Sequence, residues 1–297
     1  MNRIKNFNST SDRIFMFMVL AFLWAAVIVI IIPVVFIVAN SFSSASAIAR
    51  GAVYFWPVEF TLFGYKTIFS SDYILKGFVN TFVYTLLGTV ISVVLTLMAA
   101  YPLSRKDIAG RRVLMFLFIF TMLFNGGMIP TYLCVRRLDL INTVWAMVLP
   151  NALAVWNVII TRTYIETTIP ADIYESASLD GCRDSVFFIK MVIPLSKPII
   201  AVNVLLYAIW QWNSFFPALL YLDDPNMRPL QLVLRDILIS GVNMPNISDV
   251  KSVLDQQYLK NLLQYSLIIV SSLPVMILYP FIQKYFIRGI MVGAIKG

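Results

Sequence analysis

Long hydrophobic stretches alternate with short polar connections along nearly the whole chain. Crossing a bilayer core of roughly 30 Å takes about 20 apolar residues in a helix. Six stretches reach that length without any Asp, Glu, Lys or Arg: residues 14–40, 77–104, 113–135, 141–161, 198–222 and 261–283. One charge at the centre of such a helix would cost about 2.5–3.5 kcal/mol. The pattern therefore predicts an all-α polytopic membrane protein with six transmembrane helices in a single domain over residues 1–297.

The basic residues in the connections predict how these helices are oriented. If the connections alternate between the two sides, Lys and Arg number 14 on the side of both termini and nine on the other. With acids included, the net charges are +7 and +1. Because positive charge favours the cytoplasmic side, we expect cytoplasmic termini, a cytoplasmic loop over residues 162–197 and an outer loop over 223–260. Cys134 and Cys182 then lie on opposite sides, which excludes a disulfide between them.

Composition narrows the chemistry that the chain could perform. Of its 297 residues, 60% are hydrophobic and 13% charged, whereas a soluble domain is normally about a quarter charged. Histidine is absent, which removes Ser-His and Cys-His nucleophile pairs and His-ligated metals. No phosphate loop of the form G-x-x-x-x-G-K-[ST] occurs. We therefore expect no catalytic residue, no metal site and no cofactor on this chain, and we assign the +8 net charge to membrane orientation rather than nucleic-acid binding.

The least apolar long stretch between two hydrophobic windows is YESASLDGCRDSVFFIKMVIPLSKP, residues 174–198. Just before and within it, ETTIPADIYESASLDG predicts a short helix, with Thr167 and Thr168 as capping hydroxyls, Pro170 in the first turn and Gly181 as the stop. A second helix over residues 185–193 should end at Pro194. We expect Ile173, Tyr174 and Ala177 to pack against the membrane helices and the first helix to expose a small-residue surface to another protein. The residues alone equally fit a solvated amphipathic linker.

A resemblance favours the protein-contact reading. E-S-A-x-x-D-G-C, followed by two prolines, is similar to the EAA coupling motif of binding-protein-dependent ABC importer permeases. That motif is usually written E-A-A-x-x-x-G and is followed by I-x-L-P. The residues that carry the match are Glu175, Ser176, Ala177, Asp180, Gly181, Cys182 and Pro194. Ser176 and Cys182 depart from the usual alanines, but both are small enough for close helix contact.

The resemblance extends along the chain. PVEFTLFGYKTIFSSDYILKGFVNT (57–81), YPLSRKDIAGRR (101–112) and the ending GIMVGAIKG resemble segments of maltose-type, MetI-like carbohydrate permeases. NGGMIPTYL and RPLQLVLRDIL resemble the LplC/YtcP-like subgroup of complex-sugar importers. Such a chain is a multi-pass protein of the bacterial inner membrane, surrounded by lipid.

This resemblance implies a transport subunit rather than an enzyme. The chain would form half of the pore with a second, homologous permease chain, and the subgroup favours a heterodimer. Two ABC ATPase subunits would hold ATP and Mg, and an extracytoplasmic solute-binding protein would deliver a carbohydrate, such as an oligosaccharide. The motif residues would form a coupling helix that seats in an ATPase cleft. The outer loop would reach into the binding protein.

Aromatic and amide side chains mix in IWQWNSFFPALLYL, residues 209–222. Aromatic rings stack on the apolar faces of sugars and amides bind their hydroxyls, so the segment is a candidate substrate path. An aromatic belt at the membrane interface explains the same rings. A break at FNGGMIP (124–130) indicates either an unwound segment or a simple helix end. The candidate path residues are Asn125, Asn151, Trp210, Gln211, Trp212, Asn213 and Phe216.

Two alternatives to a sugar importer remain open. A secondary transporter would usually show more spans, internal repeats and an ionisable residue inside a span, and none of the six windows contains one. An ABC permease for a non-sugar solute shares the coupling motif, so the motif does not decide the substrate.

Overall fold

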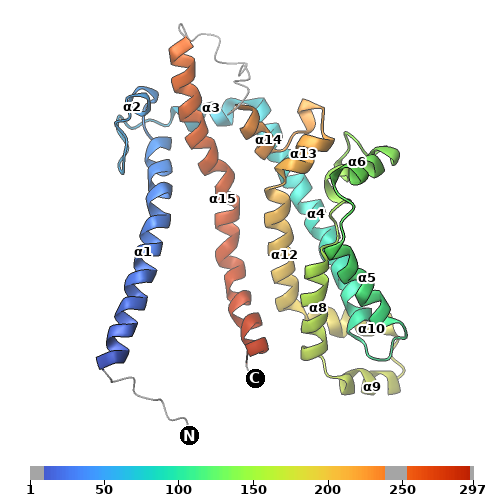
Figure 1. The fold of residues 1–297 in the computed structure, drawn as a ribbon. Helices are drawn as coiled ribbons and strands as arrows, with labels where there is room; N and C mark the ends of the chain where they lie inside the picture. The colour runs from blue at the N-terminus through green and yellow to red at the C-terminus, as the bar shows by residue number, and fades with distance from the viewer. Residues whose placement is uncertain (1–9, 238–252, 295–297) are drawn as a thin grey trace. The chain divides into compact units, whose positions relative to one another are not determined.

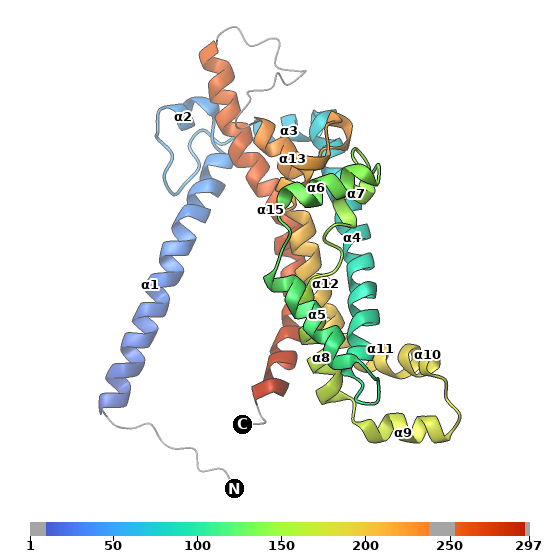
Figure 2. The same cartoon turned by 45° about the vertical axis from the view of Figure 1, so that its right-hand side comes forward.

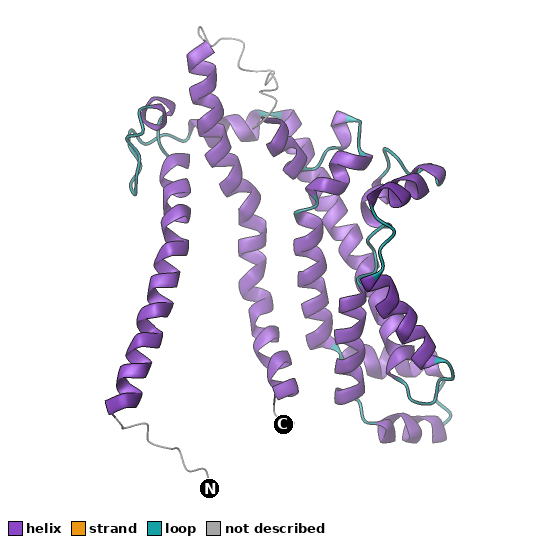
Figure 3. Ribbon diagram, in the orientation of Figure 1, coloured by secondary structure: helices purple, strands orange, loops and turns teal. Residues whose placement is uncertain are grey.

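The computed structural model describes residues 10–237 and 253–294, with side chains over 10–237 and 258–280. Regular structure within these ranges is helical throughout (Figure 3). Parts of the expected outer loop (238–252) and the end of the glycine-rich tail lie outside the described residues.

Three described helices are long and apolar enough to cross a membrane. They are α1 (Thr10–Ser41), α4 (Asp72–Ser104) and the stretch Tyr258–Pro280 of α15 (Val253–Ala294). The number rises to five if each of two bent helix pairs forms one span. The first, second and sixth predicted windows thus coincide with continuous helices. The other three windows do not.

The window 113–135 is split at FNGG. Helix α5 (Arg111–Leu123) ends there, and α6 (Met128–Arg137) leaves at 110° to it. Gly127 has φ +88°, a conformation that side chains with a Cβ rarely adopt. The Gly-Gly pair therefore turns the chain sharply instead of merely ending a helix.

The fourth and fifth windows are also interrupted. Residues 141–161 contain α7 (Val144–Val148), a turn, and the first half of α8 (Val155–Thr168). Residues 198–222 contain most of α12 (Lys197–Trp212) and α13 (Phe215–Tyr221). Beyond them lie η2 (Pro225–Met227) and α14 (Leu230–Arg235). Charge-free composition marked these segments as apolar but could not show where their helices stop.

The chain divides into two compact units. One holds residues 1–71 and 237–270, with α1, α2 (Ala45–Ala49), α3 (Phe63–Ser70) and the first part of α15. Here the Tyr65 hydroxyl donates to Ser41 Oγ at 2.8 Å, and the Ser266 hydroxyl donates to the Ser41 carbonyl at 3.3 Å. A Cβ on Gly64 would lie 2.3 Å from Ser266 Oγ, so only glycine permits this helix approach.

The second unit, residues 72–236 and 271–297, is built around α4. Helices α8 and α12 pack along α4, and α14 crosses its first turns (Figure 1, Figure 2). Polar side chains line the seam between α4, α8 and α12: Thr89, Ser92, Thr96, Asn157, Thr161, Asn203, Tyr207 and Gln211, all buried. We call this set the polar seam.

Neutral hydrogen bonds join the three helices within the polar seam. Asn203 Nδ2 donates to Thr161 Oγ1 at 2.6 Å, and the Thr96 and Tyr207 hydroxyls lie 2.7 Å apart. Gln211 Nε2 donates to the Met147 carbonyl at 3.3 Å. Gly88 makes room for that amide, since a Cβ there would lie 2.0 Å from Gln211 Nε2. Each bond fixes the register of α12 against its neighbours.

Candidate functional site

Helix α9 (Ala171–Leu179) carries the centre of the predicted coupling motif. Asp172 lies in its first turn, where a negative charge favours the helix dipole. At its end the Cys182 amide donates to the Ala177 carbonyl at 2.9 Å and the Gly181 amide to the Ser178 carbonyl at 3.0 Å. These paired bonds, with Gly181 at φ +77°, form a Schellman stop. Gly181 ends the helix as the sequence predicts.

The start of the helix differs from the prediction. Helix α8 continues through Thr168, so the predicted loop 162–197 begins with seven helical residues. The Thr167 hydroxyl donates to the Thr163 carbonyl at 2.9 Å inside α8 and caps nothing. The expectation that Thr167 and Thr168 cap the coupling helix is wrong, because the residues before Pro170 still belong to the preceding helix. Pro170 is itself the residue at the cap position of α9.

The two faces of α9 differ in what they contact. Ile173, Tyr174 and Ala177 pack, together with Cys182, against a buried apolar cluster from α4, α8 and the following helix. Ala177 faces inward with Ile173 and Tyr174 as predicted, whereas Cys182 also packs inward instead of forming part of an exposed small-residue surface. Their place in the motif reflects the Schellman stop and the packing beneath it.

Ser176, Ser178 and Leu179 on α9 and Asp180 just after it are exposed away from the packed face. Glu175 is exposed as well, but it lines a cavity behind the helix. Leu179 is 89% exposed, the largest fraction among the exposed large hydrophobics. Sequence reasoning missed Leu179, although its position off the inward face of Ile173 and Ala177 was available from helical spacing. Leu179 with its polar neighbours offers another protein an apolar contact inside a polar rim, the arrangement found at protein interfaces.

The second predicted helix runs two residues further than expected. It comprises α10 (Asp184–Phe187), a π-helical turn over Phe188–Val192 and α11 (Ile193–Leu195). Pro194 lies exposed inside its last turn instead of ending it. The chain then bends by 78° into α12, which begins with Pro198 in its first turn as predicted.

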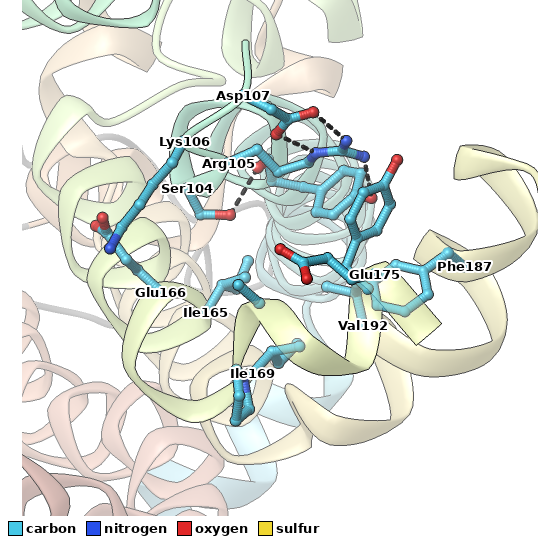
Figure 4. Close-up of a pocket in the computed structure, with 14 residues that line it drawn as sticks. Ser104, Arg105, Lys106, Asp107, Ile165, Glu166, Ile169, Glu175, Phe187 and Val192 are labelled. Atoms are coloured by element: carbon cyan, nitrogen blue, oxygen red, sulfur yellow. Dashed lines mark hydrogen bonds and ion pairs between the residues drawn. The ribbon is translucent and has the colours of Figure 1, made fainter. Parts of the chain in front are cut away.

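Arg105, just beyond the end of α4, joins α4 to this helical region (Figure 4). Its Nη1 donates to Asp184 Oδ1 at 2.6 Å, and its other nitrogens bind Asp107. Its guanidinium carbon lies 3.6 Å from the centre of the Tyr174 ring. The Tyr174 hydroxyl in turn donates to Asp184 Oδ1 at 2.8 Å. We call Arg105, Asp107, Tyr174 and Asp184 the arginine cluster.

The charges in the arginine cluster stabilise one another. Hydrogen bonds from the Tyr174 hydroxyl and then from Arg105 lower the pKa of the Asp184 carboxyl below its usual value. The hydrogen bond from Arg105 likewise lowers the pKa of Asp107. The hydrogen bond with Asp107 raises the pKa of Arg105 further above its already high value. All three groups therefore stay charged at neutral pH.

A cavity of about 300 Å³ lies behind the first turn of α9 (Figure 4). Ile165, Phe187 and Val192 form its apolar wall, while Arg105 and Glu175 lie among its polar lining. On the α8 side, Glu166 binds Arg162 at 3.1 Å and Arg111 at 3.4 Å. These ion pairs connect the start of α5 to the last turns of α8. The start of α9, by contrast, is separated from α8 and α4 by the open space of the cavity.

The predicted substrate-path residues do not converge on one site. Trp210, Asn213 and Phe216 line an open groove of about 440 Å³ at the junction of α12 and α13. Gln211 and Trp212 are buried elsewhere and do not line this groove, so their place on a substrate path stays a prediction. Gln211 lies in the polar seam, and Trp212 Nε1 donates to the Ser271 carbonyl at 2.9 Å.

The two other candidate asparagines are also separate. Asn125 Oδ1 accepts from the Gly127 amide at 2.9 Å and so shapes the FNGG break. Asn151 is exposed in the turn between α7 and α8. Neither residue lines the groove at Trp210. Sequence could mark them as polar residues in apolar windows but could not show that they lie on different elements.

Comparisons with known proteins bear on this arrangement. No family model matches the chain. The polygalacturonan/rhamnogalacturonan transport system permease protein YtcP of Bacillus subtilis (strain 168) is 38% identical over 287 residues, 96% of this chain and 99% of that protein. Protein LplC of the same organism is 36% identical over 291 residues, 98% of this chain and 97% of that protein.

A solved structure agrees with these relatives. A chain of a bacterial ABC transporter involved in the import of the acidic polysaccharide alginate matches with a TM-score of 0.86 and 34% sequence identity. The match covers 94% of this chain and 98% of the other. Together with the long apolar helices α1, α4 and α15, these likenesses place the chain among membrane proteins.

Proposed function

The chain belongs to the family of sugar ABC importer permeases, and from this premise we propose how it works within a transporter. It forms half of a pore in the bacterial inner membrane, paired with a second permease chain that is homologous but different. Six spans, with both termini in the cytoplasm, carry it through the bilayer. The bent pair α5–α6, the interrupted fourth window from α7 to α8, and α12 supply the spans beyond α1, α4 and α15.

The exposed face of α9 docks on an ABC ATPase subunit. The observation that supports this most is Leu179, 89% exposed and bordered by Ser176, Ser178 and Asp180. Small neighbours let a partner surface close around the leucine, which can then serve as an aliphatic anchor in a pocket of the partner. Glu175 and Asp180 orient the contact electrostatically. ATP and Mg are held by the two ATPase subunits, and this chain contributes no catalytic group.

The transported solute is a carbohydrate, delivered by an extracytoplasmic binding protein. Two matched proteins name acidic polysaccharides, one polygalacturonan and rhamnogalacturonan and the other alginate, which favours an oligosaccharide, in particular one with acidic sugar units. The groove at Trp210, Asn213 and Phe216 offers rings and an amide of the kind that bind sugars. The same rings suit an interfacial belt, so the groove supports the substrate assignment less strongly than the relatives do.

Reconstitution tests the proposal. The chain, its partner permease, the ATPase and the binding protein are incorporated into liposomes, and uptake of oligogalacturonides is followed with and without internal ATP. We expect ATP-dependent uptake that needs the binding protein. ATP-independent uptake driven by an ion gradient would contradict the importer assignment in favour of a secondary transporter. ATP-dependent uptake of a non-sugar solute alone would overturn only the carbohydrate assignment.

A further inference from the structure

Arg105 is positioned between two parts of the molecule that the proposed function requires to move together. It follows directly on α4, the helix around which the second unit is packed. It contacts Tyr174 on α9 and Asp184 on α10 through its ring stacking and its ion pair. Its side chain is only 12% exposed, although Asp107 and Asp184 are 59% and 65% exposed. The arginine is thus enclosed by its partners.

Because of the cavity behind α9, the contacts of Arg105 hold a helix that is only partly packed. Because about 300 Å³ of open space separates the first turn of α9 from α8 and α4, apolar packing holds only part of the helix. The packed part is the inward face at Ile173, Tyr174 and Ala177. At Tyr174 the ring also meets Phe187 edge-on, with centroids 5.2 Å apart. Tyr174 is therefore the residue through which α9, α10 and α4 are all connected.

The chemistry of the cluster requires arginine rather than a generic cation. Stacking on Tyr174 uses the flat guanidinium face, while the edge nitrogens bind two carboxylates at the same time. A lysine ammonium is a single point charge, so it could not stack on the Tyr174 ring and bind two carboxylates at the same time. Neighbouring Lys106 is exposed and forms no ion pair among the described residues, which makes it a matched control of the same charge.

We propose that Arg105 is a positioning residue that transmits displacement of α9 to α4. The inference rests on the proposed docking of α9 to an ATPase and deepens it. When an ATPase subunit shifts α9, the stacked and ion-paired arginine draws the end of α4 with it, and α4 carries α12 and α8 through the polar seam. Without the arginine, α9 moves into the space behind it while α4 stays in place.

The test uses the complete reconstituted transporter and measures solute taken up per ATP hydrolysed. We expect Arg105→Gln to lower this ratio about tenfold, within the range usual for coupling between two sites, with ATP hydrolysis retained. Arg105→Lys should recover part of the loss, and Lys106→Gln should match the wild type. A merely structural role would reduce the amount of assembled transporter and leave the ratio intact. A wild-type ratio in Arg105→Gln would overturn the inference.

Tyr174 supplies a second test that does not depend on Arg105→Gln folding. Tyr174→Phe keeps the ring beneath the guanidinium and should keep most of the coupling, whereas Tyr174→Leu should lose it. Equal ratios in these two variants would contradict the inference.

A Leu179→Glu variant separates this inference from the proposed function. Full uptake with Leu179→Glu would refute ATPase docking by α9 itself. Loss of uptake with Leu179→Glu and a normal ratio with Arg105→Gln would refute only the role of Arg105.

Discussion

The polar seam and the arginine cluster both join helices through polar side chains, but they do so in opposite environments. In the seam, neutral groups such as Asn203 and Thr161 meet where both residues are buried. In the cluster, charged groups meet where Asp107 and Asp184 remain more than half exposed. Breaking a buried hydrogen bond leaves a polar group without water to replace its partner, whereas an exposed ion can exchange its partner for solvent.

This difference indicates which part of the molecule is rigid and which can adjust. The seam holds α4, α8 and α12 in one register, because any slip would strand buried amides and hydroxyls. The arginine cluster keeps α9 and α10 oriented against the end of α4. It still permits small displacements, because water can replace a partner of its exposed carboxylates. A rigid body with an adjustable docking helix is the arrangement that a motion-transmitting subunit needs.

The largest expected effect comes from closing the space that Gly88 leaves for Gln211. Gly88→Ala places a Cβ 2.0 Å from Nε2 of a side chain that is 2% exposed, so the amide has no free space to enter. We expect a loss of about 1–3 kcal/mol in stability, measured by thermal unfolding in detergent. Gly126→Ala, where the nearest atom is 3.8 Å away, should be neutral. A Gly88→Ala protein as stable as Gly126→Ala would mean that the seam is loosely packed.

Gly181, which ends the docking helix α9, tests the adjustable part of the molecule without changing the polar seam. A Cβ at Gly181 meets nothing within 4 Å, but φ is +77°. Left-handed backbone costs an ordinary residue roughly 1–2 kcal/mol. We expect Gly181→Val to loosen the end of α9 and uncouple ATP hydrolysis from uptake while insertion stays normal. Gly181→Asn, which tolerates this backbone better, should retain more uptake. Normal substrate-stimulated hydrolysis and uptake in Gly181→Val would be incompatible with a docking role for this turn.

A smaller effect should follow from separating the two hydroxyls of the seam. Thr96→Val and Tyr207→Phe each remove one partner of the 2.7 Å contact. The Tyr207 hydroxyl also accepts from the Ala154 amide at 3.1 Å, so Tyr207→Phe should cost more than Thr96→Val. In a double-mutant cycle on unfolding, we expect an interaction of about 0.5–1.5 kcal/mol. An interaction of zero would show that the two hydroxyls do not support each other.

The smallest effect concerns pH and the arginine cluster. The folded-state pKa of Asp184 lies below its unfolded value, so its contribution is full above the unfolded pKa of about 3.9 and is lost as the pH falls through the folded pKa. Between pH 8 and pH 5 the distance between spin labels on α9 and α4 should therefore stay constant. A change in that distance within this window would mean that Asp184 is not held by Tyr174 and Arg105 as described.

Much of this organisation was predictable from sequence because it depends on local chemistry. Gly181 ends a helix for a backbone reason, and FNGG breaks one for the same reason. The inward packing of Ala177 followed from its helical spacing with Ile173 and Tyr174, but that of Cys182 did not, because a small residue just beyond a helix suits an inward or an outward position equally well. Sequence could not show that Gln211 and Trp212 lie away from the groove at Trp210, since amides and indoles suit a ligand path and a buried helix seam equally well. Arg105 drew attention only as one of several basic residues, and its importance depends on partners 69 and 79 positions away in the sequence.

The most direct test of the account asks what the exposed face of α9 touches. A photo-cross-linking amino acid is placed at Leu179, and the control carries it at Phe60, which is 67% exposed and is expected on the outer side of the membrane. The account predicts that irradiation of the assembled transporter links position 179, and not position 60, to the ATPase subunit, with a yield that changes when ATP is bound. Absence of an ATPase adduct from position 179 in a transporter that still imports sugar would contradict it.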